Sequence, residues 1–221
     1  MTYFLFATYL VFFCWLITRI KFIQQTGLNN QWLIGLFVLK VAAGVVYGYY
    51  YSTIPNFENS ADSWKFFFDA RADTQLLYQN PVRYFLSIFD NPYDKDYRHL
   101  FSSANSYWND LKHIYMVKIV SLFNVLSGSR YYVNVIFFSF VTFFGPIAFI
   151  RVMNDVFPGK KLLITCSTFL LPSFLFWSSG IHKDGLIFTY VSLLVFVVYF
   201  GMKKKKLGIK EFLLVGLLLM L

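Results

Sequence analysis

Long apolar blocks alternate with short polar segments along most of this chain. The blocks cover about residues 3–17, 32–51, 131–150, 162–177 and 185–202. A helix of about 20 apolar residues crosses the hydrocarbon core of a bilayer, so each block predicts a membrane span. A sixth block, 212–221, reaches only about half of that thickness, and we expect the chain to continue beyond it. The pattern predicts an all-α fold, a polytopic transmembrane helix bundle that forms a single membrane domain.

One polar interruption, residues 52–113, is much longer than the others. It holds eight of the eleven acids but is rich in aromatic residues, which argues against disorder. Within it, 60–79 has helical periodicity, and Asn80 followed by Pro81 is typical of a helix N-terminus. We therefore expect interfacial helices in a large outer loop. The next apolar stretch, 114–126, has thirteen residues, too few to cross, which predicts a re-entrant or interfacial helix.

Composition supports the membrane class. Hydrophobic residues make up 57% of the chain and charged residues 14%, against about 25% charged residues in ordinary soluble domains. The net charge of +9 arises from lysines and arginines that cluster beside apolar blocks, such as 203–206. Such clusters set the orientation of membrane proteins, so we do not expect nucleic acid as a partner.

The basic clusters also predict which loops share a side of the membrane. Cytoplasmic turns after Arg19, Arg151 and Met202 place the loop 52–113 and the turn 178–184 together on the outer side. This assignment of loops to the two sides is consistent only if residues 114–126 do not cross the membrane. We expect a multi-pass protein of the plasma (inner) membrane, whose acid-rich loop and 178–184 turn face the same aqueous space.

The turn 178–184 is the polar centre of the C-terminal apolar blocks. It brings an imidazole, an ammonium and a carboxyl together in His182, Lys183 and Asp184. It is either an ordinary polar hairpin or part of a site shared with the outer loop. Lys40, near the middle of the second block, is costly in hydrocarbon. It either has a functional role, or it snorkels or pairs within the bundle.

The residue patterns narrow the chemistry. Metal-ligand spacings of histidine or cysteine are absent from the sequence, as are the Gly-rich nucleotide motifs and the Gly-x-Ser-x-Gly nucleophile motif. Carboxylates remain, beside cations and aromatic residues at a membrane boundary. A carboxylate can take a proton from an attacking hydroxyl, and Lys or Arg can hold a phosphate leaving group. This set favours acid/base chemistry on a substrate carried by a lipid.

The order of these features resembles the front half of the GT-C integral-membrane glycosyltransferases. An acidic outer loop precedes Ser127-Gly128-Ser129-Arg130-Tyr131, and a later span with Leu-Pro-Ser-Phe is followed by Asp184. The family's loop acid often lies in an Asp-Glu-x-x-Tyr setting. Here Asp62 is kept, while Ser63 replaces the Glu and Phe66 the Tyr. The large loop follows the second span here, whereas the family usually places it after the first.

The resemblance implies roles for six residues. Asp62 would be the catalytic base and Asp69, seven residues later, a second candidate. Arg130, His182 and Lys183 would bind the lipid phosphate, and Asp184 matches the family's later acid. The implied partners are membrane lipid and a lipid-linked sugar, with a divalent metal as a possible cofactor. The implied activity is transfer of a sugar from a polyprenyl-phosphate donor at the extracytoplasmic face.

Two alternatives stay open. A Wzy-like polysaccharide polymerase would also use acids, Arg and Lys near lipid-linked sugars at the outer face, with its large loop later in the chain. A non-enzymatic transporter or assembly component of cell-envelope glycan export would need charges along several spans, and only Lys40 lies in the middle of one.

Overall fold

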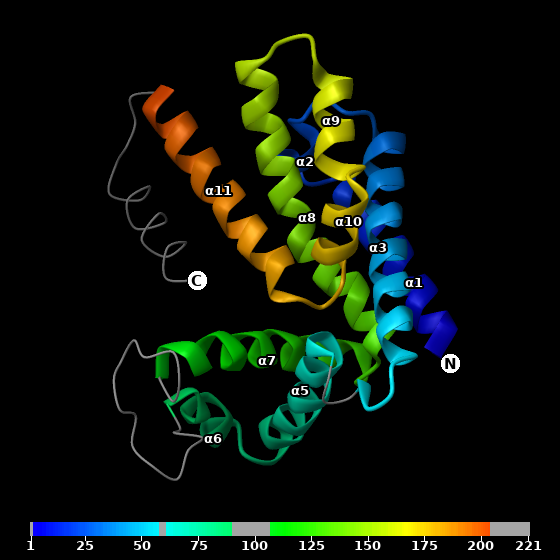
Figure 1. Ribbon diagram of the computed structural model, residues 1–221, viewed down its shortest axis with the longest axis vertical. Coiled ribbons are helices and arrows are strands. Elements are labelled where there is room, and N and C mark those ends of the chain that lie inside the picture. Colours follow the sequence, from blue (N-terminus) through cyan, green and yellow to red (C-terminus); the bar gives the residue numbers. More distant parts are fainter. Residues whose placement is uncertain (1, 58–60, 90–106, 204–221) are drawn as a thin grey trace. The chain divides into compact units, whose positions relative to one another are not determined.

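The computed structural model describes residues 2–57, 61–89 and 107–203, and within it the side chains of 107–110 are not described. These residues form helices and connections without a strand, so the predicted all-α class is confirmed for them. The helices, drawn in Figure 1, are α1 Thr2–Ile17, α2 Lys21–Gln24, α3 Asn30–Ser52, α5 Asp62–Gln79, α6 Pro81–Leu86, the 3-10 helix η1 Ser87–Phe89, α7 Tyr107–Ser127, α8 Tyr131–Val156, α9 Lys161–Phe169, α10 Pro172–Ser179 and α11 Lys183–Lys203.

Three of these helices, α3, α8 and α11, are long and apolar enough to cross a membrane, and α1 is a shorter apolar helix. The stretch 162–177, predicted as one span, contains the end-to-end helices α9 and α10 with a bend of 57° between them. Pro172 explains the bend, because proline cannot donate a helical hydrogen bond and forces the preceding residue, Leu171, into an extended conformation. The pair counts as a fourth candidate span if it crosses as one broken helix.

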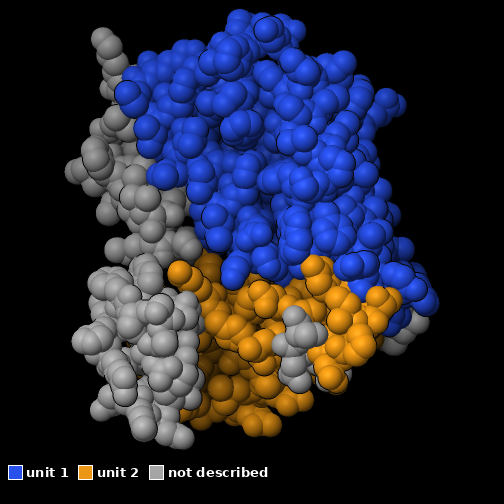
Figure 2. All heavy atoms as spheres, in the orientation of Figure 1, with its two compact units in different colours: residues 1–50, 135–221 blue, residues 51–134 orange. Residues whose placement is uncertain are grey.

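The chain divides into two compact units, coloured separately in Figure 2. Unit 1 comprises residues 1–50 and 135–221, and unit 2 comprises residues 51–134. Unit 1 therefore contains all of α11 and most of α3 and α8, the helices that are candidates for spans, and unit 2 contains the part of the predicted outer loop that is described. The predicted block 212–221 lies outside the described residues.

Small residues let the helices of unit 1 approach closely. A Cβ at Gly44 of α3 would collide with the carbonyl oxygen of Ser179 in α10, and one at Gly145 of α8 would lie 2.7 Å from the Cα of Thr189 in α11. Helices in a membrane gain most of their packing energy from such close contact, because lipid removes the hydrophobic difference between inside and outside.

Basic residues gather at one end of unit 1. The Arg151 guanidinium, near the end of α8, lies 4.6 Å from the ring centroid of Phe22 in α2 and 4.5 Å from that of Phe196 in α11. Lys203, the last residue of α11, forms an ion pair with Asp155 of α8. Helix α2 and the C-terminal ends of α8 and α11 thus meet at this end, and the turn that begins α11 lies at the other end of that helix (Figure 1).

Unit 2 is built on the packing of α5 against α7, with α6 alongside. The predicted helix over 60–79 corresponds to α5, and the predicted N-terminus at Asn80 is confirmed because its Oδ1 accepts a hydrogen bond from the Arg83 amide at 3.0 Å. Helix α7 is longer than the predicted 114–126 and is not a candidate span among the described helices. It ends where Gly128 and Ser129 adopt positive φ angles.

Candidate functional site

A carboxylate and an imidazole form a pair on the surface of unit 2. The Oδ2 atom of Asp69 in α5 lies 2.9 Å from Nε2 of His113 in α7, and the two side chains are 42% and 39% exposed. The ring of Phe66 lies 5.1 Å from the imidazole, between centroids. The pair is accessible to a substrate, and a carboxylate on one ring nitrogen fixes the orientation of the imidazole.

Buried hydrogen bonds between α5 and α7 hold this pair in place. The Thr74 hydroxyl lies 3.2 Å from the carbonyl oxygen of Ser121 and accepts a hydrogen bond from the Asn124 amide, also at 3.2 Å. Both contacts lie one to two turns beyond Asp69 on the same helix pair. They fix the register of the helices, so Asp69 and His113 meet without help from a flexible loop.

A lysine, Lys118, lies one to two turns further along this helix pair. The Lys118 ammonium contacts Asp73 at 2.8 Å and donates to Ser87 and to the Tyr84 carbonyl, each at 2.8 Å. It also lies 3.8 Å from the centroid of the Tyr84 ring. Three acceptors satisfy the three donors of a lysine, so Lys118 joins α5, α6 and α7 as a structural residue.

Tyr84 completes this structural cluster. Its hydroxyl lies 2.7 Å from the Ser121 hydroxyl in the buried contact between α6 and α7. Burial raises the pKa of the Tyr84 phenol, and the nearby Asp73 charge raises it further, while the bond to Ser121 acts in the opposite direction. The phenol therefore stays protonated to higher pH than an exposed tyrosine.

Asp62, the base that the resemblance implies, begins helix α5 and is exposed. An acid in the first turn suits the positive end of the helix dipole. Seven residues separate it from Asp69, which places the two about 10 Å apart along the helix axis. The structure pairs the second candidate, Asp69, with an imidazole.

Arg130 lies at the other end of unit 2 and makes local contacts. Its Nη1 donates to the carbonyl oxygen of Ser127 at 3.0 Å, and its amide lies 3.4 Å from the Ser127 hydroxyl. These contacts satisfy groups at the C-terminus of α7, where a cation is favoured by the helix dipole.

In unit 1 the turn before α11 brings His182 and Asp184 together. Nδ1 of the buried His182 lies 3.3 Å from Oδ2 of Asp184, which is half-exposed, and 3.4 Å from the Asp184 amide. The imidazole packs near the rings of Trp177 and Tyr47. Lys183 is exposed at the start of α11. The turn thus presents one buried imidazole together with an exposed cation and an accessible carboxylate.

Lys40 lies directly behind this turn. It is 1% exposed, and its ammonium donates to the carbonyl oxygen of Ser178 at 2.8 Å and to the Ser178 hydroxyl at 3.3 Å. A buried charge needs such partners. The contact ties the middle of α3 to the end of α10, two residues before the turn begins at Gly180. Lys40 therefore pairs within the bundle, as one of the two predicted interpretations requires.

The six predicted site residues fall into both units. Asp62, Asp69 and Arg130 belong to unit 2, and the set 182–184 belongs to unit 1. The structure brings together Asp69 with His113 and His182 with Asp184, each inside its own unit. A site shared between the 178–184 turn and the outer loop remains a prediction from the charge pattern.

The sequence pattern did not identify His113 as a site residue, although the spacing of acidic and basic residues pointed to it. Asp69 and Asp73 lie four residues apart and so share a face of α5. His113 and Lys118 lie five residues apart on α7, close enough to meet these two acids in turn. Two acids matched with two basic residues on a neighbouring predicted helix indicate that the two helices pack together.

The described residues offer no set of ligands for the divalent metal that the resemblance implies. In the part of the chain that the structure describes, no group of three histidines, cysteines or acids is placed to hold a metal ion.

Comparison of the chain with protein-family models, with curated proteins and with solved structures gives no match. The candidate site is therefore defined by its own geometry, and Asp69–His113 is the imidazole–carboxylate pair whose histidine is the more exposed, at 39% against 10% for His182.

Proposed function

We propose that this protein is a membrane glycosyltransferase that moves a sugar from a polyprenyl-phosphate donor to a hydroxyl acceptor at the extracytoplasmic face. The observation that carries the proposal is the accessible Asp69–His113 pair, at 2.9 Å on the α5–α7 surface. Histidine is the commonest general base, and a positioned base of this kind accelerates proton transfer. The proposal moves the base from Asp62 to His113, with Asp69 as its partner.

The proposed reaction uses the two nitrogens of His113 differently. Nε2 faces the Asp69 carboxylate, so Nδ1 is the nitrogen that accepts the proton of the acceptor hydroxyl. As the proton leaves, the acceptor oxygen forms a bond to the anomeric carbon, and the bond from that carbon to the phosphate oxygen breaks. Polyprenyl phosphate departs with the bonding electrons. The Asp69 carboxylate stabilises the imidazolium that forms, in the way a triad acid does.

Cations at the lipid boundary would hold the departing phosphate. Lys183 is exposed at the start of α11, and the half-exposed Asp184 lies beside it. Lys183 in unit 1 and Arg130 in unit 2 are separate candidates for the phosphate contact. His182 is mostly buried and in contact with Asp184, so we assign it a positioning role in the turn.

Apolar surface on unit 2 supports the proposed interfacial placement of its helices. Five large apolar side chains on α5, α6 and η1 are more than half exposed: Tyr78, Val82, Phe85, Leu86 and Phe89. Exposed apolar surface of this extent is typical of a membrane or protein contact. In the proposed protein it anchors unit 2 at the outer surface of the plasma (inner) membrane, where lipid-linked sugars are within reach.

The direct test measures sugar transfer by the purified chain in liposomes that contain polyprenyl-phosphate mannose or polyprenyl-phosphate glucose. Release of polyprenyl phosphate reports the reaction. Asp69→Asn and His113→Gln should each lower the rate about 100-fold or more, because a general base contributes that much. Arg71→Gln, which changes an exposed charge two residues from Asp69, should leave the rate within about twofold. Full activity in both the Asp69→Asn and the His113→Gln variants would show that His113 is not the base.

A further inference from the structure

Two hollows follow one another along unit 1 where α3 lies beside α9. One, of about 320 Å³, lies between the connection 27–29 and the start of α9. The other, of about 280 Å³, continues along α3 to Leu170 at the end of α9. Trp32 lines both hollows. We treat these two neighbouring hollows, which share Trp32, as one groove and call it the α3–α9 groove; its Lys161 end lies at the basic end of the unit.

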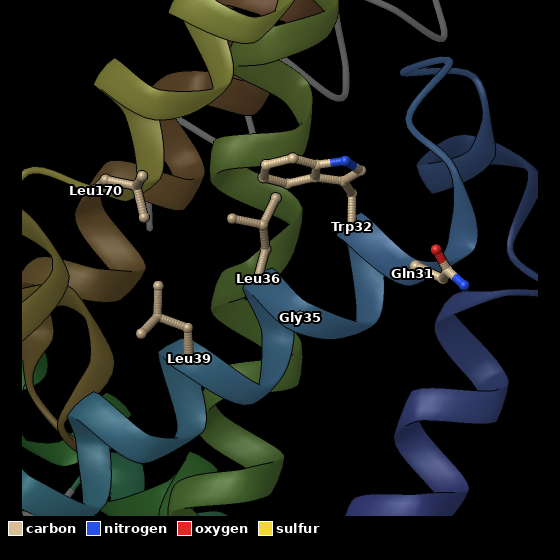
Figure 3. A pocket seen from close by; sticks show the side chains of 6 residues that line it. All are labelled: Gln31, Trp32, Gly35, Leu36, Leu39 and Leu170. Carbon is tan, nitrogen blue, oxygen red and sulfur yellow. The ribbon is translucent and has the colours of Figure 1, made fainter.

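The far part of the α3–α9 groove is apolar. Figure 3 shows Trp32, Leu36 and Leu39 on α3 with Leu170 from the neighbouring segment across from them. Gly35 lies among these side chains, and a Cβ added to it would meet no atom within 4 Å. Because position 35 carries no side chain, the backbone of α3 is open to this hollow.

The near part of the groove carries a positive charge. Lys161 lines it, and a Cβ on Gly27 would lie 3.1 Å from the Lys161 Nζ, so the ammonium lies over the backbone at Gly27. Neither hollow is lined by an acid. Among the described residues, the ion pairs of lysines involve Lys118 and Lys203, and none involves Lys161. A cation at the mouth of an apolar groove complements a ligand with an anionic head and an apolar tail.

The length of the groove matches the depth of one leaflet of a bilayer. From Asn30, where α3 begins, to Leu39 the helix advances by about 14 Å. This is close to half of the hydrocarbon core, about 30 Å thick, and so to the depth of one leaflet. The charged end lies with the other basic connections of unit 1, which the charge pattern places in the cytoplasm. Basic pockets between spans on that side bind anionic head groups.

We propose that the α3–α9 groove binds one anionic phospholipid of the cytoplasmic leaflet. Its phosphate lies at Lys161, and one acyl chain lies along Gly35, Leu39 and Leu170. This site is separate from the proposed sugar-transfer site, since its residues are at the basic end of unit 1 and none belongs to the candidate site. Its test needs no enzymatic activity.

The test is native mass spectrometry of the full chain in detergent, titrated with phosphatidylglycerol and, separately, with phosphatidylcholine. Wild type should show one saturable site that prefers phosphatidylglycerol. Lys161→Gln should weaken that site about fivefold, because a lysine near the lipid surface contributes about 1 kcal/mol. Lys21→Gln, the same change at an exposed lysine of α2, should leave the affinity unchanged within about twofold.

A second pair of variants tests the tail. Gly35→Leu places an isobutyl group in open space inside the groove, so the fold should persist while the saturable site is lost. Ala42→Leu introduces the same leucine side chain at an exposed position of α3 outside the groove and should retain the site. Equal binding of the two lipids, or unchanged binding in Lys161→Gln and Gly35→Leu, would overturn the proposal. Tighter binding of decaprenyl phosphate than of phosphatidylglycerol would overturn the phospholipid assignment.

Discussion

Nε2 of His113 lies 2.9 Å from Oδ2 of Asp69, and each of these side chains comes from a helix whose register is fixed by buried hydrogen bonds. The pair is nearly half exposed, so water competes for its hydrogen bond. A partly exposed contact of this kind contributes about 0–1 kcal/mol to stability. An arrangement that is well ordered but adds little stability is suited to chemistry at a surface.

This relationship predicts a separation of stability from activity. Asp69→Asn should lower the free energy of unfolding by less than about 1 kcal/mol while it lowers sugar transfer strongly. Thermal unfolding of the purified chain, followed alongside polyprenyl phosphate release, measures both. If Asp69→Asn unfolds the chain as readily as a core substitution does, the pair is a structural contact and its catalytic assignment is wrong.

Lys118 should behave in the opposite way. It is mostly buried, with a side-chain exposure of 12%, and it binds the 15% exposed Asp73. Lys118→Met leaves that carboxylate buried without its cation, which costs about 3 kcal/mol. Hydrogen–deuterium exchange in α5 and α7 should rise accordingly. Lys112→Met, on the exposed side of α7, is the matched control and should leave exchange unchanged; equal exchange in the two variants would remove Lys118 from the structural role.

The raised pKa of Tyr84 leads us to predict that the packing of its helix, α6, against α7 is less stable at alkaline pH. Because its pKa is raised in the folded state, by burial first and then by Asp73, folding favours the protonated phenol. This contribution is fully present below the pKa of an unfolded tyrosine, near 10, and is lost as pH rises through the folded value. Urea unfolding between pH 8 and 11 should therefore show a steeper loss in wild type than in Tyr84→Phe. Identical slopes would contradict the burial of an ionisable phenol at this contact.

Two glycines of α3 form a matched pair. A side chain at Gly44 would collide with the backbone of Ser179, whereas one at Gly35 meets open space. Gly44→Val should therefore destabilise unit 1 by about 1–3 kcal/mol through overpacking, and Gly35→Val should be close to neutral. Thermal stability of both variants in the same detergent measures the difference. Equal melting temperatures would show that α3 and α10 do not approach as closely as the structure has them.

Local chemistry in the sequence predicts local structure well here. Asn80 with Pro81 predicts a helix N-terminus, and the Asn80 side chain accepts the expected hydrogen bond. The apolar blocks predict α3, α8 and α11 because a spanning helix needs many consecutive apolar residues. The bend at Pro172 is less accessible to such reasoning, since an apolar block with a proline can continue as a kinked helix or divide.

The site depends on contacts between distant segments, which a pattern of single residues does not give. Lys40 is recognisable as an unusual charge, but its partner is the backbone carbonyl of Ser178, and every residue has a carbonyl. His113 is recognisable only if α5 and α7 are already known to pack in one register, because it meets Asp69 across 44 positions of sequence. The same limit applies to the α3–α9 groove, which needs two helices and a missing side chain at Gly35.

The proposed function requires that the Asp69–His113 pair and the 182–184 turn face one aqueous space, opposite to the basic connections. Single cysteines at Arg71, Lys183 and Lys160, in a chain whose Cys14 and Cys166 are replaced by alanine, can be labelled in intact cells with a membrane-impermeant maleimide. The account predicts labelling at positions 71 and 183 and none at position 160 until the membrane is opened. Labelling of position 71 without position 183, or of position 160 in intact cells, would contradict it.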